Sequence, residues 1–284
     1  MQTIVSGRTK KVKISPDGPM TIIGEKINPT GRKKLAAALQ EGNLEYVKEL
    51  AQKQIDAGAD LLDVNVGVPG LDDVAMLPKV VQFLGAEYDI PLCIDTPNPK
   101  ALAAALKVAP GRVLVNSVNG EEESLNAVLP LVKEHGAAVI GLVMDDNGIS
   151  NDPETRCKIA GKIIERAAKL GIPSEDIVID TLVLTVGADS NAGAVTLKTI
   201  QMVSKEFGVN INLGASNVSF GLPDRDTINQ AFLAIAIALG ATCAITDPVK
   251  YTQGIRAADL LLGRDAYAGR YIKYFRAHKS DESK

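Results

Sequence analysis

The sequence predicts an α/β protein folded as one (β/α)8 barrel of the TIM type, and three features support this prediction. Eight short apolar segments recur between residues 21 and 247, and amphipathic stretches with helical spacing alternate with them. Each short segment is almost continuously apolar, as parallel strands buried on both faces are. No GxGxxG sequence follows the first segment, so the alternative, a doubly wound open sheet, lacks the dinucleotide-binding fingerprint it often carries.

The chain begins with residues 1–20, which we expect to form an N-terminal appendage separate from the barrel domain at 21–284. Its Pro and Gly residues predict a hairpin that turns at residues 16–19. The first strand, 21–27, is followed by turn-forming residues, and apolar spacing then predicts a helix over 33–57. The same unit repeats, with further strands at 61–66, 91–96, 112–117, 138–144, 177–184, 210–219 and 242–247.

The helices are predicted from apolar residues at helical spacing, at 74–86, 99–108, 121–134, 153–170, 224–239 and 254–262. Residues 231–239 are apolar on all sides, so this helix is either deeply buried or part of a subunit interface. A C-terminal helix within 270–279 is expected to pack through Tyr271, Tyr274 and Phe275.

Composition, net charge and cysteine spacing argue against several classes of protein. Hydrophobic residues make up 46% of the 284 residues and charged residues 23%, as in an ordinary globular domain. The net charge of -3, without a basic stripe, argues against a nucleic-acid partner. Three widely spaced cysteines suggest neither disulfides nor a zinc site. The N-terminus lacks a signal-like apolar region, and no apolar run approaches the roughly 18 residues of a membrane span. We therefore expect a cytoplasmic protein that does not bind membranes.

Polar residues gather at the carboxyl ends of the predicted strands, where a barrel places its active site. They are Glu25, Asn28, Asp63, Asn65, Asp95, Asn98, Asn116, Asn119, Asp180, Asn217 and Asp247. Carboxylates and carboxamides suit a neutral heterocycle with N–H donors better than a phosphate. A Mg²⁺ or Ca²⁺ site is the rival interpretation, because hard cations bind the same oxygens. A zinc site is less favoured, since both histidines lie at probable helix ends or in the polar tail. We expect no metal.

The segment 214–221 (GASNVSFG) has no charged residue but carries an amide, hydroxyls and glycines, a composition that indicates a ligand-binding segment. We expect it to close the seventh strand, with glycines that allow close approach to a ring. The amide of Asn217 could follow a ring nitrogen whose protonation changes during reaction. The structural alternative is a strand-to-helix turn in which Asn217 only caps backbone amides.

Six segments in order resemble the pterin-binding methyltransferases: 23–28 (IGEKIN), 63–67 (DVNVG), 93–96 (CIDT), 115–117 (VNS), 179–181 (IDT) and 214–219 (GASNVS). This family includes methyltetrahydrofolate:corrinoid protein methyltransferases and the folate domain of cobalamin-dependent methionine synthase, with dihydropteroate synthase as a distant relative. The resemblance runs from residue 21 to the C-terminus. It implies a dihydropteroate-synthase-like barrel that is usually a homodimer and holds the pterin in its mouth.

The resemblance also assigns roles to residues. It implies that Asp95, Asn116 and Asp180 hold the pterin, and that Gly214 and Ser216 bring backbone groups to the ring. Asn217 matches the family asparagine beside N5, the nitrogen that carries the methyl group, and Arg225 matches an arginine shortly after it. Residues expected to support the site from behind are Glu25, Asn28, Asp63 and Asn65. Asp63 and Asn65 have an alternative role as hydrogen-bond partners of barrel loops, and Arg225 as an ordinary charge at a helix start.

The resemblance predicts a methyltransferase acting between N5 of tetrahydrofolate and the cobalt of a corrinoid. In one direction 5-methyltetrahydrofolate methylates a Co(I) corrinoid. In the other, a methylated corrinoid gives its methyl group to tetrahydrofolate during use of a methylated amine or ether. The chain lacks the DxHxxG cobalamin motif, so the corrinoid is expected on a partner protein. A folate-binding module without turnover is the alternative. Dihydropteroate synthase is disfavoured, because its lysine in the strand-seven region is replaced by the sequence around Asn217.

Overall fold

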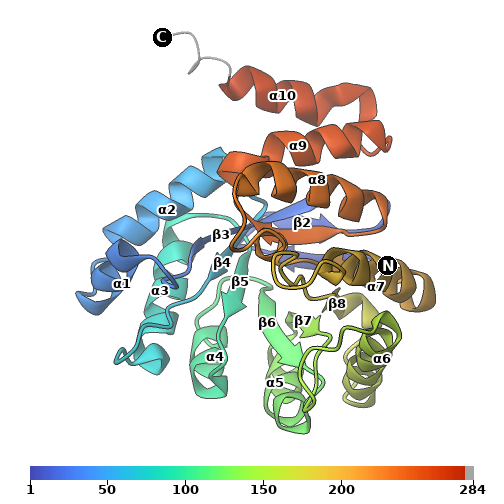
Figure 1. Cartoon of the computed structure of the whole chain (residues 1–284). Helices are drawn as coiled ribbons and strands as arrows, with labels where there is room; N and C mark the ends of the chain where they lie inside the picture. The colour runs from blue at the N-terminus through green and yellow to red at the C-terminus, as the bar shows by residue number, and fades with distance from the viewer. Residues whose placement is uncertain (279–284) are drawn as a thin grey trace.

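A parallel barrel forms the body of the computed structural model, which describes residues 1–278 (Figure 1). The strand order is β10-β3-β4-β5-β6-β7-β8-β9, and all these pairings are parallel. A parallel bridge between Gly214 and Ile245, with Ile245 N donating to Leu213 O at 2.8 Å, joins the two ends and closes the circuit. The strands are β3 Thr21–Ile27, β4 Leu61–Val64, β5 Leu92–Asp95, β6 Leu114–Asn119, β7 Ala138–Leu142, β8 Ile177–Asp180, β9 Asn210–Asn212 and β10 Cys243–Thr246. The predicted barrel is confirmed, and the open-sheet alternative is wrong.

Helices surround this barrel (Figure 1). They are α1 Lys33–Gln40, α2 Glu45–Asp56, α3 Asp73–Glu87, α4 Pro99–Leu106, α5 Glu122–His135, α6 Pro153–Lys169, α7 Ala192–Phe207, α8 Arg225–Ala238, α9 Pro248–Leu261 and α10 Gly269–His278. The last of them, α10, packs on α9 outside the ring. Three of them begin with an Asn or Asp cap followed by proline, at Asn98, Asp152 and Asp247. Each cap side chain accepts from a backbone N–H of the first turn, which fixes where the strand-end loop becomes helix.

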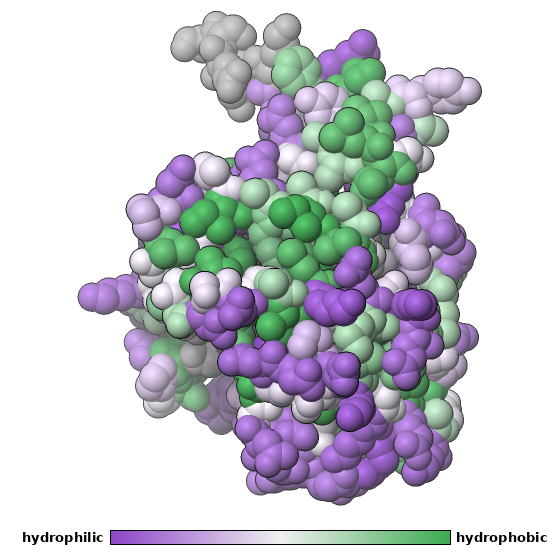
Figure 2. Space-filling model, turned by 45° about the vertical axis from the view of Figure 1, so that its right-hand side comes forward, coloured by the Kyte–Doolittle hydropathy of each residue, from purple (hydrophilic) through white to green (hydrophobic). Residues whose placement is uncertain are grey.

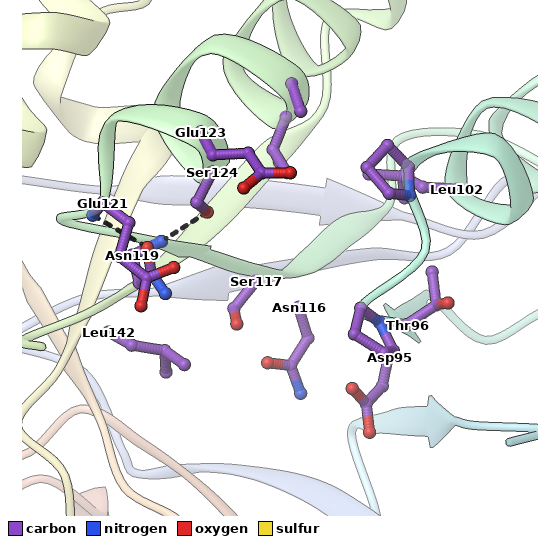
Figure 3. A pocket seen from close by; sticks show the side chains of 14 residues that line it. Asp95, Thr96, Leu102, Asn116, Ser117, Asn119, Glu121, Glu123, Ser124 and Leu142 are labelled. Carbon is purple, nitrogen blue, oxygen red and sulfur yellow. Dashed lines mark hydrogen bonds between the residues drawn. The ribbon is translucent and has the colours of Figure 1, made fainter. Parts of the chain in front are cut away.

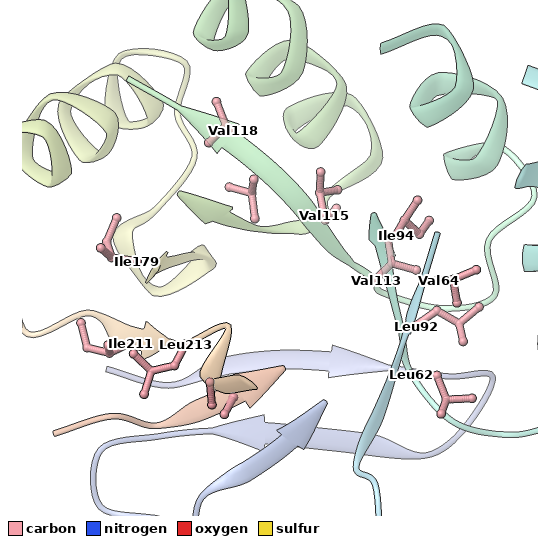
Figure 4. Packing of buried hydrophobic residues seen from close by; sticks show 14 of the residues in the cluster. Leu62, Val64, Leu92, Ile94, Val113, Val115, Val118, Ile179, Ile211 and Leu213 are labelled. Carbon is pink, nitrogen blue, oxygen red and sulfur yellow. The ribbon is translucent and has the colours of Figure 1, made fainter. Parts of the chain in front are cut away.

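Two buried apolar clusters hold the layers together. Side chains that point outward from the strands pack against the helices, among them Leu62, Val115 and Ile211 (Figure 4). The alternate side chains, such as Ile23, Leu61 and Val178, fill the barrel interior. The continuous apolar character of each strand therefore reflects burial on both faces.

The first twenty residues form the floor of the barrel. Strand β1, Thr3–Ser6, pairs antiparallel with β2, Lys11–Ile14, so the hairpin turns at 7–10 and not at the predicted 16–19. Val5 and Ile14 are fully buried in the interior cluster. Asn210 of β9 donates its Nδ2 to Thr3 Oγ1 at 2.9 Å. The apolar alternation of the hairpin therefore serves the same core as the barrel.

Several predicted boundaries differ from the structure. The helix predicted over 33–57 is two helices, because Gly42 has a φ of +69° and the chain turns there. The strand predicted over 177–184 ends at Asp180, before Leu182 adopts a φ of +55°. Helix α7 occupies a stretch for which no helix was predicted. In α10, Tyr271 and Tyr274 are half-buried but Phe275 is 43% exposed, so the predicted packing is partial. Residues 279–284 of the predicted barrel domain lie outside the described residues.

Candidate active site

A cavity of 330 Å³ lies at the carboxyl ends of the strands and is called the central cavity here. Its lining includes every residue to which the resemblance assigns a role except Asn65, Asp180 and Arg225. The full lining is Glu25, Asn28, Thr30, Arg32, Asp63, Asp95, Asn116, Gly214, Ser216, Asn217 and Ile245. Residues far apart in the sequence thus meet at one mouth, as the barrel topology requires.

Two further cavities flank the central one. The acidic side cavity has a volume of 360 Å³, shares Asp95 and Asn116 with the central cavity, and is also lined by Glu121 and Glu123 (Figure 3). The outer cavity has a volume of 220 Å³ and shares Glu25, Arg32 and Ser216 with the central cavity. Its remaining lining is Lys26, Arg225, Asp226, Asn229, Asp247, Lys250 and Tyr251. The central cavity therefore has one neighbour lined by acids and one that contains cations.

Two carboxylates at the base of the central cavity are oriented by carboxamides. Asn116 donates its Nδ2 to Asp63 Oδ1 at 3.2 Å, and Asn65 donates its Nδ2 to Asp95 Oδ2 at 3.0 Å. Asn65 is itself fixed by Gly67 N, which donates to its Oδ1 at 2.7 Å. Asp95 and Asn116 are register partners on β5 and β6, and Figure 3 shows their polar ends pointing into the same space. The peptide bond between Asn116 and Ser117 is cis.

Burial changes the protonation of these carboxylates. It raises the pKa of Asp63 to about 8, and the charge of neighbouring Asp95 adds to the effect. Burial likewise raises the pKa of Asp95, although the hydrogen bond from Asn65 opposes this. The Asp63–Asp95 pair therefore favours keeping one proton at neutral pH. A ligand that donates N–H groups would hydrogen-bond to the carboxylate that stays ionised.

Asp180 lies beneath the mouth and is absent from the linings of the cavities described above. Its Oδ1 accepts from Leu182 N at 2.8 Å and its Oδ2 from Asn212 Nδ2 at 2.6 Å. Burial raises the pKa of Asp180 to about 6, and these hydrogen bonds and the charge of Arg156 oppose the rise. The predicted contact of Asp180 with a ligand stays a prediction.

Arg156 of α6 is a site-supporting residue that the sequence did not indicate. Its side chain is fully buried, and its Nη1 donates to the carbonyls of Thr181 and Leu182, each at 2.8 Å. Its Nε donates to Ser150 O at 2.6 Å. Arg156 thus ties the loop after Asp180 to the loop before α6. An arginine in an amphipathic helix is typical of an exposed face, so only its burial indicates this role.

The segment 214–221 turns into the mouth and does not extend the seventh strand. β9 ends at Asn212, and Ala215–Asn217 form a short 3-10 helix, η2. The predicted strand over 210–219 is therefore wrong, and the turn alternative is correct in shape. The capping role is wrong, because within residues 1–278 the Asn217 side chain has no hydrogen-bond partner and is exposed at the mouth. It is free to contact a ligand.

Ser216 and Arg225 hold this segment in place. Ser216 Oγ donates to Glu25 Oε2 at 2.8 Å, which joins η2 to β3. Arg225 donates from Nη2 to Ser216 O at 2.6 Å and from Nε to Ser219 Oγ at 3.1 Å. Arg225 lines the outer cavity, not the central one. Its observed contacts support the segment that carries Asn217.

Asn28 is the remaining predicted residue of the central cavity. Asn28 lines the central cavity while its Oδ1 accepts from Thr30 N at 3.0 Å. In the part of the chain that the structure describes, no group of three or more His, Cys, Asp or Glu side chains is placed to hold a metal ion.

Over the same residues, no helix is both long and apolar enough to cross a membrane. The cations Lys26, Arg32 and Lys250 were not singled out from the sequence.

Comparisons with known proteins agree with this geometry. A sequence profile described as pterin binding enzyme matches residues 24–247. The chain is 30% identical over 268 residues to a methylcorrinoid:tetrahydrofolate methyltransferase of Eubacterium limosum, covering 92% of this chain and 97% of that protein. It is also 30% identical to the methionine synthase of Mycobacterium tuberculosis, covering 87% of this chain but only 22% of that protein.

Solved structures with the same fold include dihydropteroate synthases. One from Yersinia pestis, in complex with a sulfonamide drug, has a TM-score of 0.74 at 17% identity and covers 92% of this chain and 99% of its own. One from Vibrio fischeri has a TM-score of 0.68 at 16% identity and covers 92% of this chain and 99% of its own. At this identity the likeness concerns the fold alone. On the profile match and the sequence identity, the chain belongs to the pterin binding enzyme family.

Proposed function

We propose that this enzyme moves a methyl group between N5 of tetrahydrofolate and the cobalt of a corrinoid carried by a partner protein. The observation that carries the proposal is the exposed amide of Asn217 beside a cavity lined with buried carboxylates. The near full-length similarity to a methylcorrinoid:tetrahydrofolate methyltransferase supports the choice of reaction. The corrinoid would supply the cobalt that accepts or donates the methyl group.

The pterin ring would bind with its N–H donors toward the buried acids. Asp95 presents an ionisable oxygen to the central cavity, and Asn116 lies beside it with both donor and acceptor atoms. Asp180 would take part after a shift of Leu182 or Asn212, which occupy its oxygens. With the ring in this orientation, N5 would face Asn217 at the open mouth, where a partner protein can approach.

Asn217 would assist the transfer through the protonation of N5. A tertiary amine is a poor leaving group, so N5 would take up a proton from solvent when it releases its methyl group to the corrinoid. The Asn217 amide can accept from N5–H⁺ or rotate to donate to neutral N5. It would therefore stabilise the transition state more than the bound ground state, which raises turnover.

A direct assay tests the proposal and its alternative. The protein is mixed with 5-methyltetrahydrofolate and free reduced cobalamin, and methylcobalamin is followed by absorbance. The reverse reaction starts from methylcobalamin and tetrahydrofolate. Methyl transfer in either direction, reduced in Asn217→Ala, is the expected result. Folate binding without transfer in both directions would instead indicate a binding module without turnover.

We also propose a homodimer that pairs through the outward face of α8. Phe232, Leu233, Ala236 and Ile237 are buried, whereas Ala231, Ala234, Ile235 and Ala238 are exposed on the opposite side. Nearby, Leu261 is 87% exposed and Tyr267 is fully exposed. Figure 2 shows apolar surface from the projecting α9 and α10 helices down to the level of α8. Two symmetric copies could bury this surface against each other.

Sedimentation velocity of Ile235→Glu tests this pairing. The parent should sediment as a dimer and the variant as a monomer. Val108→Glu is the matched control, because Val108 is 38% exposed and follows α4, on another part of the barrel. A monomeric parent would contradict the dimer.

The three cysteines are all free and buried, which supports a reducing compartment such as the cytoplasm.

A further inference from the structure

Arg32 stands where the central cavity meets the outer cavity, and it lines both. It precedes α1 at the N-cap position and is half-buried. Across the described residues, 1–278, its guanidinium has no carboxylate or hydrogen-bond partner. A half-buried guanidinium with five unused donors is well placed to bind an anionic group of a ligand.

The other cations of the outer cavity already have partners. Lys26 pairs with Glu25 at 3.1 Å and with Asp247 at 2.5 Å. Lys250 pairs with Asp226 at 2.9 Å. Arg225 donates to Ser216 O and Ser219 Oγ. Within residues 1–278, Arg32 is therefore the outer-cavity cation whose side chain has neither an ion-pair nor a hydrogen-bond partner, whereas Arg225 is already held by two neutral oxygens.

The two flanking cavities differ in how they would receive an anion. The acidic side cavity is lined by Asp95, Glu121 and Glu123 and by no lysine or arginine. An anionic group that entered it would meet like charges. The outer cavity is lined by four cations and three carboxylates, and the cations include Arg32. An anionic extension of a ring bound in the central cavity would therefore leave through the outer cavity.

We propose that Arg32 binds a carboxylate of the glutamate tail of the folate and directs that tail through the outer cavity. This inference rests on the proposed function, because it takes the ring to be a tetrahydropterin bound in the central cavity. The tail carries two carboxylates, and a planar guanidinium can bind one of them bidentately. Further γ-linked glutamates would extend past Arg225 and Lys250. The site is thus selective for glutamylated folates over simple pterins.

Calorimetry with two ligands separates the ring from the tail. The first ligand is 5-methyltetrahydrofolate. The second is 5,6-dimethyltetrahydropterin, which has the same ring but lacks the aminobenzoyl-glutamate tail. Arg32→Gln should weaken binding of the folate about tenfold, the range for a partly exposed charge-assisted contact, and leave binding of the tail-less pterin unchanged. Arg32→Lys should restore part of the loss. Added salt should weaken folate binding to the parent more than to Arg32→Gln.

Lys33→Gln is the matched control, because it removes the same charge from the adjacent, exposed residue, which lines neither cavity. It should bind both ligands like the parent. Equal weakening of both ligands by Arg32→Gln would overturn the tail assignment and place Arg32 against the ring. No weakening of either ligand would overturn it too, while the proposed function would stand if the parent binds the tail-less pterin. A parent that binds neither ligand would overturn both proposals.

Discussion

Replacing Asp63 with asparagine should change how the stability of this protein depends on pH. Asp63 is 3% exposed, and burial together with the charge of Asp95 raises its pKa from 3.8 to about 8. The folded protein therefore holds this proton more tightly than the unfolded chain does. Ionising Asp63 costs stability, and the cost grows as the pH rises from the unfolded pKa towards the folded one.

The size of the effect follows from the two pKa values. Each unit of pKa shift corresponds to about 1.4 kcal/mol, so the full titration costs about 6 kcal/mol. About 4 kcal/mol of this falls between pH 5 and pH 8, because the unfolded carboxylate is already ionised there while the folded one is losing its proton. Asp63→Asn cannot ionise, and its amide oxygen can still accept from Asn116.

Urea unfolding at pH 5 and pH 8 measures this difference. Between these pH values the parent should lose about 4 kcal/mol more of its unfolding free energy than Asp63→Asn does. Asp17→Asn, at an exposed position in the loop before β3, is the isosteric control and should behave like the parent. Equal losses in the parent and in Asp63→Asn would show that Asp63 is ionised at both pH values, and the proton assigned to Asp63 would have to be abandoned.

Five other changes test the site and the loops that support it. Asp95→Ala and Asp180→Ala should each weaken folate binding by about 1.5–3 kcal/mol, measured by calorimetry, because each removes an ionisable acceptor; binding like the parent would move the ring elsewhere. Asn217→Ala should reduce turnover by roughly 10²–10³ with little change in affinity, and weak binding with normal saturated turnover would leave Asn217 only a positioning role. EDTA should leave turnover unchanged, and a loss restored by Mg²⁺ would support a metal site. Arg156→Met should lower unfolding free energy by about 3–5 kcal/mol in urea titration, because the loop carbonyls lose their buried donor.

The barrel and most of its mouth could be predicted because the signals are local and repeated. Apolar strands recur, and most of them end in a polar residue at the point where parallel strands must converge. Asp63, Asp95, Asn116 and Asn217 all reach the central cavity for this reason. Strand ends were predicted less well, since the turn at Ala215–Asn217 depends on backbone contacts that a loosely alternating sequence does not reveal.

Long-range contacts account for the rest. Arg156 looks like any helix-surface cation until its carbonyl partners 25 and 26 residues away are known. Arg32 differs from neighbouring basic residues only in facing two cavities without a partner. Residues 1–20 were predicted as an appendage separate from the barrel. The sequence near Val5 and Ile14 does not reveal that these side chains pack into the barrel interior.

A proton retained by the Asp63–Asp95 pair also explains how these carboxylates could bind a ring although, among the described residues, carboxamides, and no lysine or arginine, donate side-chain hydrogen bonds to them. A pterin presents N–H donors next to a carbonyl acceptor. Two ionised carboxylates would offer acceptors only and would repel each other at close range. With one proton retained, the pair offers a donor as well as acceptors, and Asn116 adds one of each. Ring binding should then need little change in total charge, so affinity for a tail-less pterin should vary less with pH than the stability of the empty protein does.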